Sequence, residues 1–252
     1  MADTGWIERA ESGAVKQFHS VYVQCRQPGI SRSQFQRLWR SHGDYAASVP
    51  AFWRNVERYV HNDPVDPAAG VPADTARFDG VGELFYTSFD IWLGMRDVMW
   101  NEVAPDEKRV FAGPPTVSTR GTRTAYQPPR GTCKLFTFAA PRPGTDPDRL
   151  DTMLDDHALT TLALTGFGGR LAGYTTTRAL RPDAGSGMQR MAQTSSSHEL
   201  LFIHHFEDEH AALAALASAD HARLEVAQDA LFDWDTRVVI LTHGWVLKGD
   251  IG

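Results

Sequence analysis

Two histidines occupy the same position in two similar patterns of apolar residues. The first pattern ends on His42 and the second on His157, 115 residues later. In each pattern the histidine follows three apolar residues at the spacing i, i+3, i+4 and i+7: Phe35, Leu38 and Trp39 before His42, and Leu150, Met153 and Leu154 before His157. This spacing lines up one face of an α-helix, so both imidazoles are expected to face the interior. A buried imidazole can act as a general acid or base near neutral pH, or it can simply bond a neighbouring strand.

Two tyrosines repeat with the same separation as the histidines. Tyr59 and Tyr174 are again 115 residues apart, and each lies in a segment rich in residues that favour strands. A phenol in such a place can polarise a substrate carbonyl, although core packing is the simpler role. His61 shares the sheet face of Tyr59 because residues two apart on a strand point the same way. The candidate catalytic residues are therefore His42, His157, His61, Tyr59 and Tyr174.

Large aromatic side chains near these groups predict a cleft for a hydrophobic small molecule. The candidate substrate-binding residues are Trp39, Phe85, Trp92, Arg96, Trp100 and His19. Arg96 interrupts the apolar face of a second expected helix, where its guanidinium can clamp a carboxylate or extend past the core into water. His19 lies on the first expected strand.

Neither a nucleic acid nor a membrane is expected as a partner, and a homodimer is possible.

Several well-known catalytic and metal motifs are missing from the sequence. His204 and His205 are adjacent on an expected strand and so point to opposite faces, which disfavours a shared metal ion. The sequence has no H-E-x-x-H, no paired C-x-x-C and no G-x-S-x-G motif. We therefore expect neither a metal site nor a cofactor.

Composition limits the class of protein. The chain has 252 residues, a formal net charge of −6 and a pI near 5.9, without the dense basic face that nucleic-acid binding requires. Neither a secretory signal nor an apolar run long enough to cross a membrane is evident. Cys25 and Cys133 lie in apolar segments and are expected to be reduced core residues. These features predict a cytoplasmic protein.

Hydrophobic periodicity predicts two copies of a β-α-β-β-α-β unit, the order of a ferredoxin-like fold. In the first copy, strands are expected at 15–26, 53–62, 78–85 and 117–126, and helices at 31–48 and 89–103. In the second, strands are expected at 134–140, 169–180, 199–206 and 237–248, with helices at 147–164 and within 211–232. A polar loop is expected at 181–197.

The register of the repeat supports this duplication. The separation is 115 residues up to Tyr59 and Tyr174, then 116 for Glu83 and Glu199, and 121 for Phe111 and Phe232, as loop insertions would produce. The chain is accordingly divided into a lead-in at 1–14, a first unit at 15–126, a linker at 127–131 and a second unit at 132–252. The expected fold class is α+β.

Four segments of the first half resemble the EthD-type family of the dimeric α/β-barrel superfamily. They are FQRLWRSH at 35–42, RYVHN at 58–62, FDGVGELF at 78–85 and DEKRVF at 106–111. The family commonly has a histidine four residues after the tryptophan, where this chain has Gly43. The resemblance implies that two tandem ferredoxin-like units pair their antiparallel sheets into an α/β barrel within one chain.

The resemblance also implies a range of functions, from cofactor-free dehydratases, decarboxylases, cyclases and isomerases to haem-binding and accessory proteins. Combined with the inward histidines, it predicts a cofactor-independent lyase or a cyclase or isomerase. Such an enzyme would act on an aromatic or polycyclic molecule by histidine acid–base chemistry. The alternatives are a non-catalytic small-molecule-binding protein and a haem-binding barrel.

Overall fold

The computed structural model describes residues 15–180, 198–229 and 231–249. The predicted lead-in at 1–14 and the loop at 181–197 lie outside the described residues. Within the described part, no helix is both long enough and apolar enough to cross a membrane.

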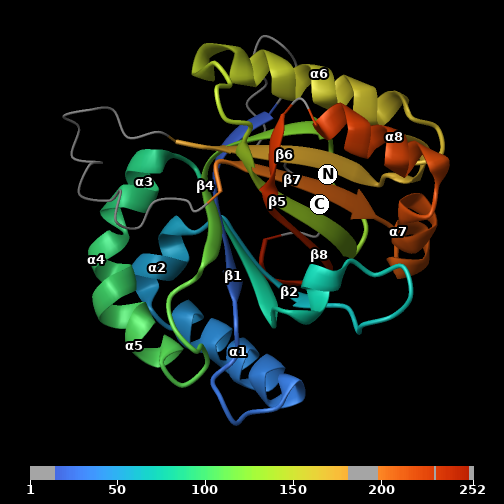
Figure 1. The fold of residues 1–252 in the computed structure, drawn as a ribbon. Coiled ribbons are helices and arrows are strands. Elements are labelled where there is room, and N and C mark those ends of the chain that lie inside the picture. Colours follow the sequence, from blue (N-terminus) through green and yellow to red (C-terminus); the bar gives the residue numbers. More distant parts are fainter. Residues whose placement is uncertain (1–14, 181–197, 230, 250–252) are drawn as a thin grey trace, which may run out of the picture.

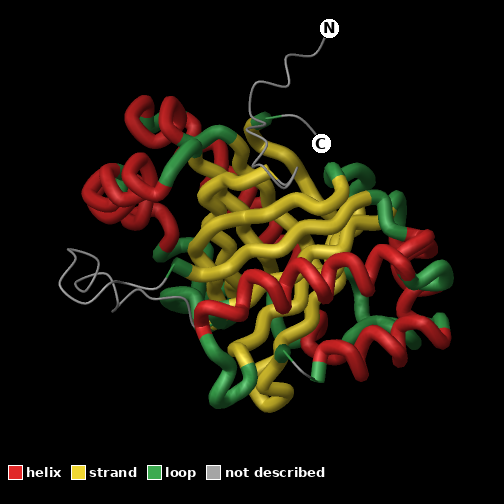
Figure 2. Tube along the Cα trace, turned by 90° about the horizontal axis from the view of Figure 1, so that it is seen from above, coloured by secondary structure: helices red, strands yellow, loops and turns green. Residues whose placement is uncertain are grey.

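Eight antiparallel strands form a closed barrel in the order β1-β3-β2-β8-β5-β7-β6-β4. Figures 1 and 2 show the strands enclosed between two groups of helices. The strands are β1 (Val15–Gln24), β2 (Arg58–Pro64), β3 (Gly80–Tyr86), β4 (Val117–Gln127), β5 (Cys133–Pro141), β6 (Gly173–Ala179), β7 (Leu200–Phe206) and β8 (Phe232–Lys248).

Each half of the chain contributes one four-stranded sheet with the same topology. The first sheet runs β4-β1-β3-β2 and the second β8-β5-β7-β6, and they join through the pairs β2–β8 and β4–β6. The predicted α+β fold of two paired ferredoxin-like units is therefore confirmed.

The helices lie outside the barrel, with α1 to α5 over the first sheet and α6 to α8 over the second (Figure 1). They are α1 (Arg32–Ala47), α2 (Pro50–Asn55), α3 (Phe89–Gly94), α4 (Arg96–Val98), α5 (Ala104–Glu107), α6 (Leu150–Ala163), α7 (Glu209–Leu216) and α8 (Ala219–Gln228). A π-helical turn, η2 (Met99–Val103), joins α4 to α5, and short 3₁₀ turns are η1 (Ala73–Ala76), η3 (Pro147–Arg149) and η4 (Gly168–Arg170).

Helix α1 begins where the sequence predicts. The Ser31 hydroxyl accepts the Gln34 backbone N–H, and the Gln34 side chain accepts the Ser31 backbone N–H, which is a complete capping box. Trp39 and His42 are buried on the inner face of this helix. The helix therefore presents the predicted histidine to the interior.

Three local predictions are wrong. Residues 50–55 form helix α2, starting with Pro50 in the first turn, and the strand predicted from Trp53 starts only at Arg58. The single helix predicted at 89–103 is broken into α3, α4 and η2, and Trp100, a predicted substrate-binding residue, is 75% exposed. Cys25 is exposed just after β1 ends, whereas Cys133 is buried as predicted.

Strand pairing corrects the register of the repeat at the third strand. Tyr59 pairs with Leu84, and its equivalent Tyr174 pairs with His204, so the separation there is 120 residues rather than 116. The equivalent of Glu83 is therefore Ile203, and Glu199 is not its counterpart.

The barrel interior combines an apolar cluster with a buried ionic group. Glu83 Oε1 accepts a hydrogen bond from Lys134 Nζ at 2.5 Å, and Glu83 Oε2 lies 3.3 Å from His19 Nε2. Burial opposes ionisation of Glu83, but Lys134 and His19 together keep the pKa of this carboxyl well below its usual range. The interior is thus filled by side chains from both units, which ties the two sheets together.

A candidate active site between the first sheet and helices α1 to α5

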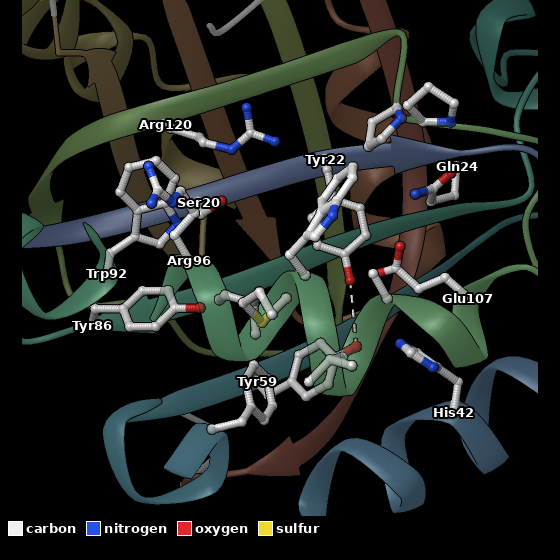
Figure 3. Close-up of a pocket in the computed structure, with 18 residues that line it drawn as sticks. Ser20, Tyr22, Gln24, His42, Tyr59, Tyr86, Trp92, Arg96, Glu107 and Arg120 are labelled. Carbon is white, nitrogen blue, oxygen red and sulfur yellow. Dashed lines mark hydrogen bonds between the residues drawn. The ribbon is translucent and has the colours of Figure 1, made fainter. Parts of the chain in front are cut away.

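A cavity of 270 Å³ lies between the outer face of the first sheet and the helices that cover it. Figure 3 shows its side chains converging from strands β1 to β4 and from helices α1 to α5. Its apolar wall contains Phe52, Leu84, Trp92, Met99 and Val103, and its polar groups are Ser20, Tyr22, Gln24, His42, Tyr59, Tyr86, Arg96, Glu107 and Arg120. A mainly apolar cavity with a few convergent polar groups is the usual form of a small-molecule site.

His42 is held at one end of the cavity by a carboxylate. Its Nδ1 lies 2.9 Å from Asp106 Oδ2, and Arg109 binds both oxygens of the same carboxylate at 2.6 and 2.9 Å. Burial lowers the pKa of His42, and the contact with Asp106 offsets only part of that effect. His42 is therefore neutral at pH 7. We assign its proton to Nδ1, which donates to Asp106, so Nε2 is the basic nitrogen.

Glu107 follows Asp106 and lines the cavity beside His42 (Figure 3). Burial, with a smaller contribution from Asp106, raises the pKa of Glu107 from 4.5 to about 7. This carboxyl group is thus close to half protonated at neutral pH. A group with a pKa near the working pH can both donate and accept a proton efficiently.

Three tyrosine hydroxyl groups face the same space. The Tyr22 and Tyr59 oxygens are 3.3 Å apart, and one hydroxyl donates to the other. Burial raises the pKa of Tyr22 and of Tyr59, and the Glu107 carboxylate adds to both effects, so these phenols stay protonated. The buried Tyr86 hydroxyl has no hydrogen-bond partner, which leaves it free to bond a ligand.

Arg120 marks the opposite end of the cavity. Its guanidinium lies near Tyr86, and burial lowers its pKa while Tyr86 and Tyr22 partly restore it. Figure 3 shows Arg120, Tyr86, Trp92 and Arg96 together on the side of the cavity away from His42 and Glu107. Arginine stays charged under all relevant conditions, so this end suits a polar or anionic substituent.

The structure brings together five of the residues predicted from sequence. His42 and Tyr59, predicted as catalytic, and Trp92, Arg96 and Trp100, predicted to bind substrate, all line the cavity. Arg96 and Trp100 are largely exposed and lie at its edge, where Arg96 also bonds Asp97.

His61 and Trp39 lie beneath the cavity rather than in its lining. Their rings stack with centroids 3.9 Å apart, and Arg40 Nη1 bonds His61 Nδ1 at 3.0 Å. His61 does share a face with Tyr59, as predicted, with ring centroids 4.7 Å apart. The pair packs α1 against β2 and so supports the wall that carries Tyr59.

His19 and Phe85 point into the barrel interior, away from the cavity. Their rings stack with centroids 4.2 Å apart, and His19 Nδ1 bonds Thr177 Oγ1 at 2.9 Å across the barrel. Strand alternation explains this placement, because Ser20 and Leu84 are the neighbours that face the cavity.

His157 and Tyr174 lie in the core of the second unit. His157 Nδ1 lies 3.0 Å from the Tyr174 hydroxyl, and the His157 ring packs edge to face against Phe202. Although His157 repeats the position of His42, it has no carboxylate partner among the described residues, and no described cavity is lined by it. The two histidines therefore have different surroundings.

Sequence reasoning missed Tyr22, Tyr86, Glu107 and Arg120. Tyr22 lies two residues after Ser20 on the first strand, so the alternation of the strand puts both side chains on the same face. Asp106 and Glu107 stand together in the segment that resembles the EthD family. Only the fold shows that this segment returns to the end of α1, next to His42.

Part of the first unit is similar to a known domain, and the whole chain is similar in fold to several solved structures. Residues 27–115 match the EthD domain. An anthrone oxidase-like protein superposes with a TM-score of 0.54 at 11% identity, covering 93% of this chain and 94% of its own. A candidate monooxygenase from Fusobacterium nucleatum superposes with a TM-score of 0.52 at 10% identity, covering 92% and 93%.

A candidate chlorite dismutase gives a TM-score of 0.51 at 10% identity, covering 91% of this chain and 95% of that protein. No curated protein matches the chain in sequence. Similarity at this level of identity establishes the fold of the whole chain, and no activity follows from it. Residues 27–115 are thus similar to the EthD domain, and the whole chain shares its two-unit barrel fold with these solved structures.

Proposed function

We propose that the cavity lined by His42 and Glu107 is the active site of an enzyme that transfers protons on a hydrophobic aromatic substrate. The reaction class is dehydration, decarboxylation, cyclisation or isomerisation. One observation carries the proposal: a neutral histidine fixed by Asp106 stands beside a carboxyl group whose pKa is about 7, in an apolar cavity. Titratable groups with such perturbed pKa values are typical of catalytic sites.

His42 serves as the general base. Its Nε2 takes a proton from a substrate carbon or hydroxyl, and the resulting imidazolium is stabilised by the Asp106 carboxylate on Nδ1. Glu107 supplies a proton to the leaving oxygen or to the carbanion that forms. In a dehydration, His42 removes the proton and the C–H electrons become the new double bond. The hydroxyl group takes the proton of Glu107 and leaves as water. His42 then returns its proton to Glu107.

The tyrosines stabilise the charge that develops on the substrate oxygen. Tyr86 has an uncommitted hydroxyl, and the Tyr22–Tyr59 pair has one hydroxyl hydrogen left to donate. Donors that are fixed before the reaction are worth more in an apolar cavity than in water. Arg120 binds a polar or anionic group at the far end, so the substrate spans the cavity with its reactive carbon near His42.

The size of the cavity restricts the substrate. Its 270 Å³ lies slightly below the range of about 300–1,000 Å³ of sites for drug-sized ligands. It suits a single-ring or small fused-ring molecule. No step of the proposed reaction uses a haem.

The test is a screen for reaction products, and its control is a variant whose cavity is filled by a larger side chain. Purified protein is incubated with aromatic compounds that carry hydroxyl, carbonyl or carboxyl groups, and loss of water or carbon dioxide, or isomerisation, is followed by mass spectrometry and NMR. A Ser20→Phe variant, which fills the cavity from β1, is the control. The proposal predicts a product that forms with wild type and not with Ser20→Phe or Glu107→Gln. Tight binding by the wild type without any product would instead indicate a non-catalytic binding protein.

A further inference from the structure

A second cavity, of 350 Å³, lies between the sheet of the second unit and helices α7 and α8. Leu135 and Thr137 on β5 and His204 on β7 form its floor. These three residues are the repeat equivalents of Ser20, Tyr22 and Leu84, which line the first cavity. The duplication has thus produced two cavities on equivalent sheet faces, with different side chains in each.

His204 is the unusual residue of this cavity. Its side chain is buried, and neither ring nitrogen has a hydrogen-bond partner. Among the described residues that line the cavity, it is the one with such unpaired buried nitrogens. One face of its ring is covered by Tyr174, with centroids 4.8 Å apart at an angle of 17°. Buried polar groups normally have hydrogen-bond partners. A bound ligand can supply the partner that the His204 ring nitrogens lack.

The charged groups around the cavity are already paired. Arg237 Nη1 bonds Glu225 Oε1 at 3.1 Å. The Asp74 carboxylate accepts the Val239 backbone N–H at 3.0 Å and the Arg77 guanidinium at 2.6 Å. Burial, with further contributions from His157 and His221, keeps the pKa of His204 well below its ordinary value, so this imidazole is neutral. A charged ligand would therefore meet no unpaired opposite charge on the floor of the cavity.

The chemistry of the ligand follows from this pattern. A neutral imidazole offers one N–H donor and one nitrogen acceptor, which matches a hydroxyl group that donates and accepts. Phe167 packs edge to face against the His204 ring, with centroids 5.1 Å apart, and Leu216 and Leu224 are further apolar side chains in a lining that also contains polar ones. We propose that this cavity is a second binding site, for a small neutral aromatic molecule whose hydroxyl group bonds His204. The site is separate from His42 and does not depend on the function proposed for the first cavity.

The test follows His204 itself while phenol is added to the full-length chain. Histidine ring carbons are labelled with ¹³C, and the signal of His204 is assigned by its loss in His204→Phe, which retains a ring against Tyr174. The proposal predicts a saturable shift of the His204 signal. It also predicts that calorimetry shows phenol binding to this cavity weakened about three- to tenfold in His204→Phe, as the loss of one hydrogen bond implies.

Two further variants separate this site from the first cavity. Leu216→Trp fills the second cavity and should abolish the shift of His204, whereas His42→Phe changes the first cavity and should leave that shift unaltered. A His204 signal that does not move at saturating phenol would show that the cavity holds only water and would overturn the proposal. An equal shift in wild type and in Leu216→Trp would overturn it as well.

Discussion

Replacing Glu107 by glutamine is expected to stabilise the protein at alkaline pH while removing its activity. In the folded chain Glu107 has a pKa of about 7 instead of 4.5, mainly because it is buried. The folded state therefore keeps the proton to a higher pH than the unfolded state does. It follows that the free energy of unfolding falls as the pH rises from about 4.5 to about 7, and remains lowered above that range.

The size of the effect follows from this pKa difference. About 2.5 pH units correspond to about 3 kcal/mol if the whole difference is expressed as stability. Because the side chain is partly exposed, we expect about 1–3 kcal/mol. Glutamine keeps the shape but cannot ionise, so Glu107→Gln avoids this cost above neutral pH.

Urea unfolding of wild type and Glu107→Gln at about pH 5 and about pH 8 measures the difference directly. The matched control is Glu102→Gln, which removes an exposed carboxylate from the preceding helical turn. We expect the two proteins to have similar free energies of unfolding at the lower pH, and Glu107→Gln to be the more stable at the higher pH. A stability difference that is the same at both pH values would refute the argument, because the effect of glutamine would then be unrelated to ionisation.

Three further changes test other parts of the structure. Glu83→Gln leaves the buried Lys134 and His19 without their carboxylate and should lower the free energy of unfolding by about 3–5 kcal/mol in urea titrations. Trp39→Ala removes a fully buried side chain and should cost about 3–5 kcal/mol by the same measurement. Gly82→Ala places a Cβ against the Tyr22 ring, so it should lower turnover roughly tenfold or more by displacing that hydroxyl, with a small change in Tm.

Local patterns predicted the elements of the fold well where one signal was clear. The spacing that ends on His42 predicted α1, and the order of elements predicted two ferredoxin-like units. The sequence did not reveal that 50–55 is a short helix. An aromatic segment such as AFWRN suits either a strand or a helix, and packing of Phe52 against Tyr59 decides between them.

The site was predictable only in part, for a physical reason. His42 and His157 have the same helical pattern, and what distinguishes them is the element that returns to each. The segment with Asp106 and Glu107 reaches His42, whereas His157 meets Tyr174 and Phe202. Likewise, strand alternation was sufficient to place His61 with Tyr59, but not to show that Trp39 would cover the His61 ring. Such contacts depend on distant parts of the chain.

The most direct test of the proposed chemistry compares two matched variants, His42→Gln and His157→Gln, in the reaction that the product screen identifies. Both change a buried histidine at the same position of the repeat, and circular dichroism checks that both remain folded. We expect His42→Gln to lower kcat by about 10²–10⁴-fold, the usual contribution of a general base, and His157→Gln to leave it nearly unchanged. Full turnover by folded His42→Gln would contradict the assignment of the active site.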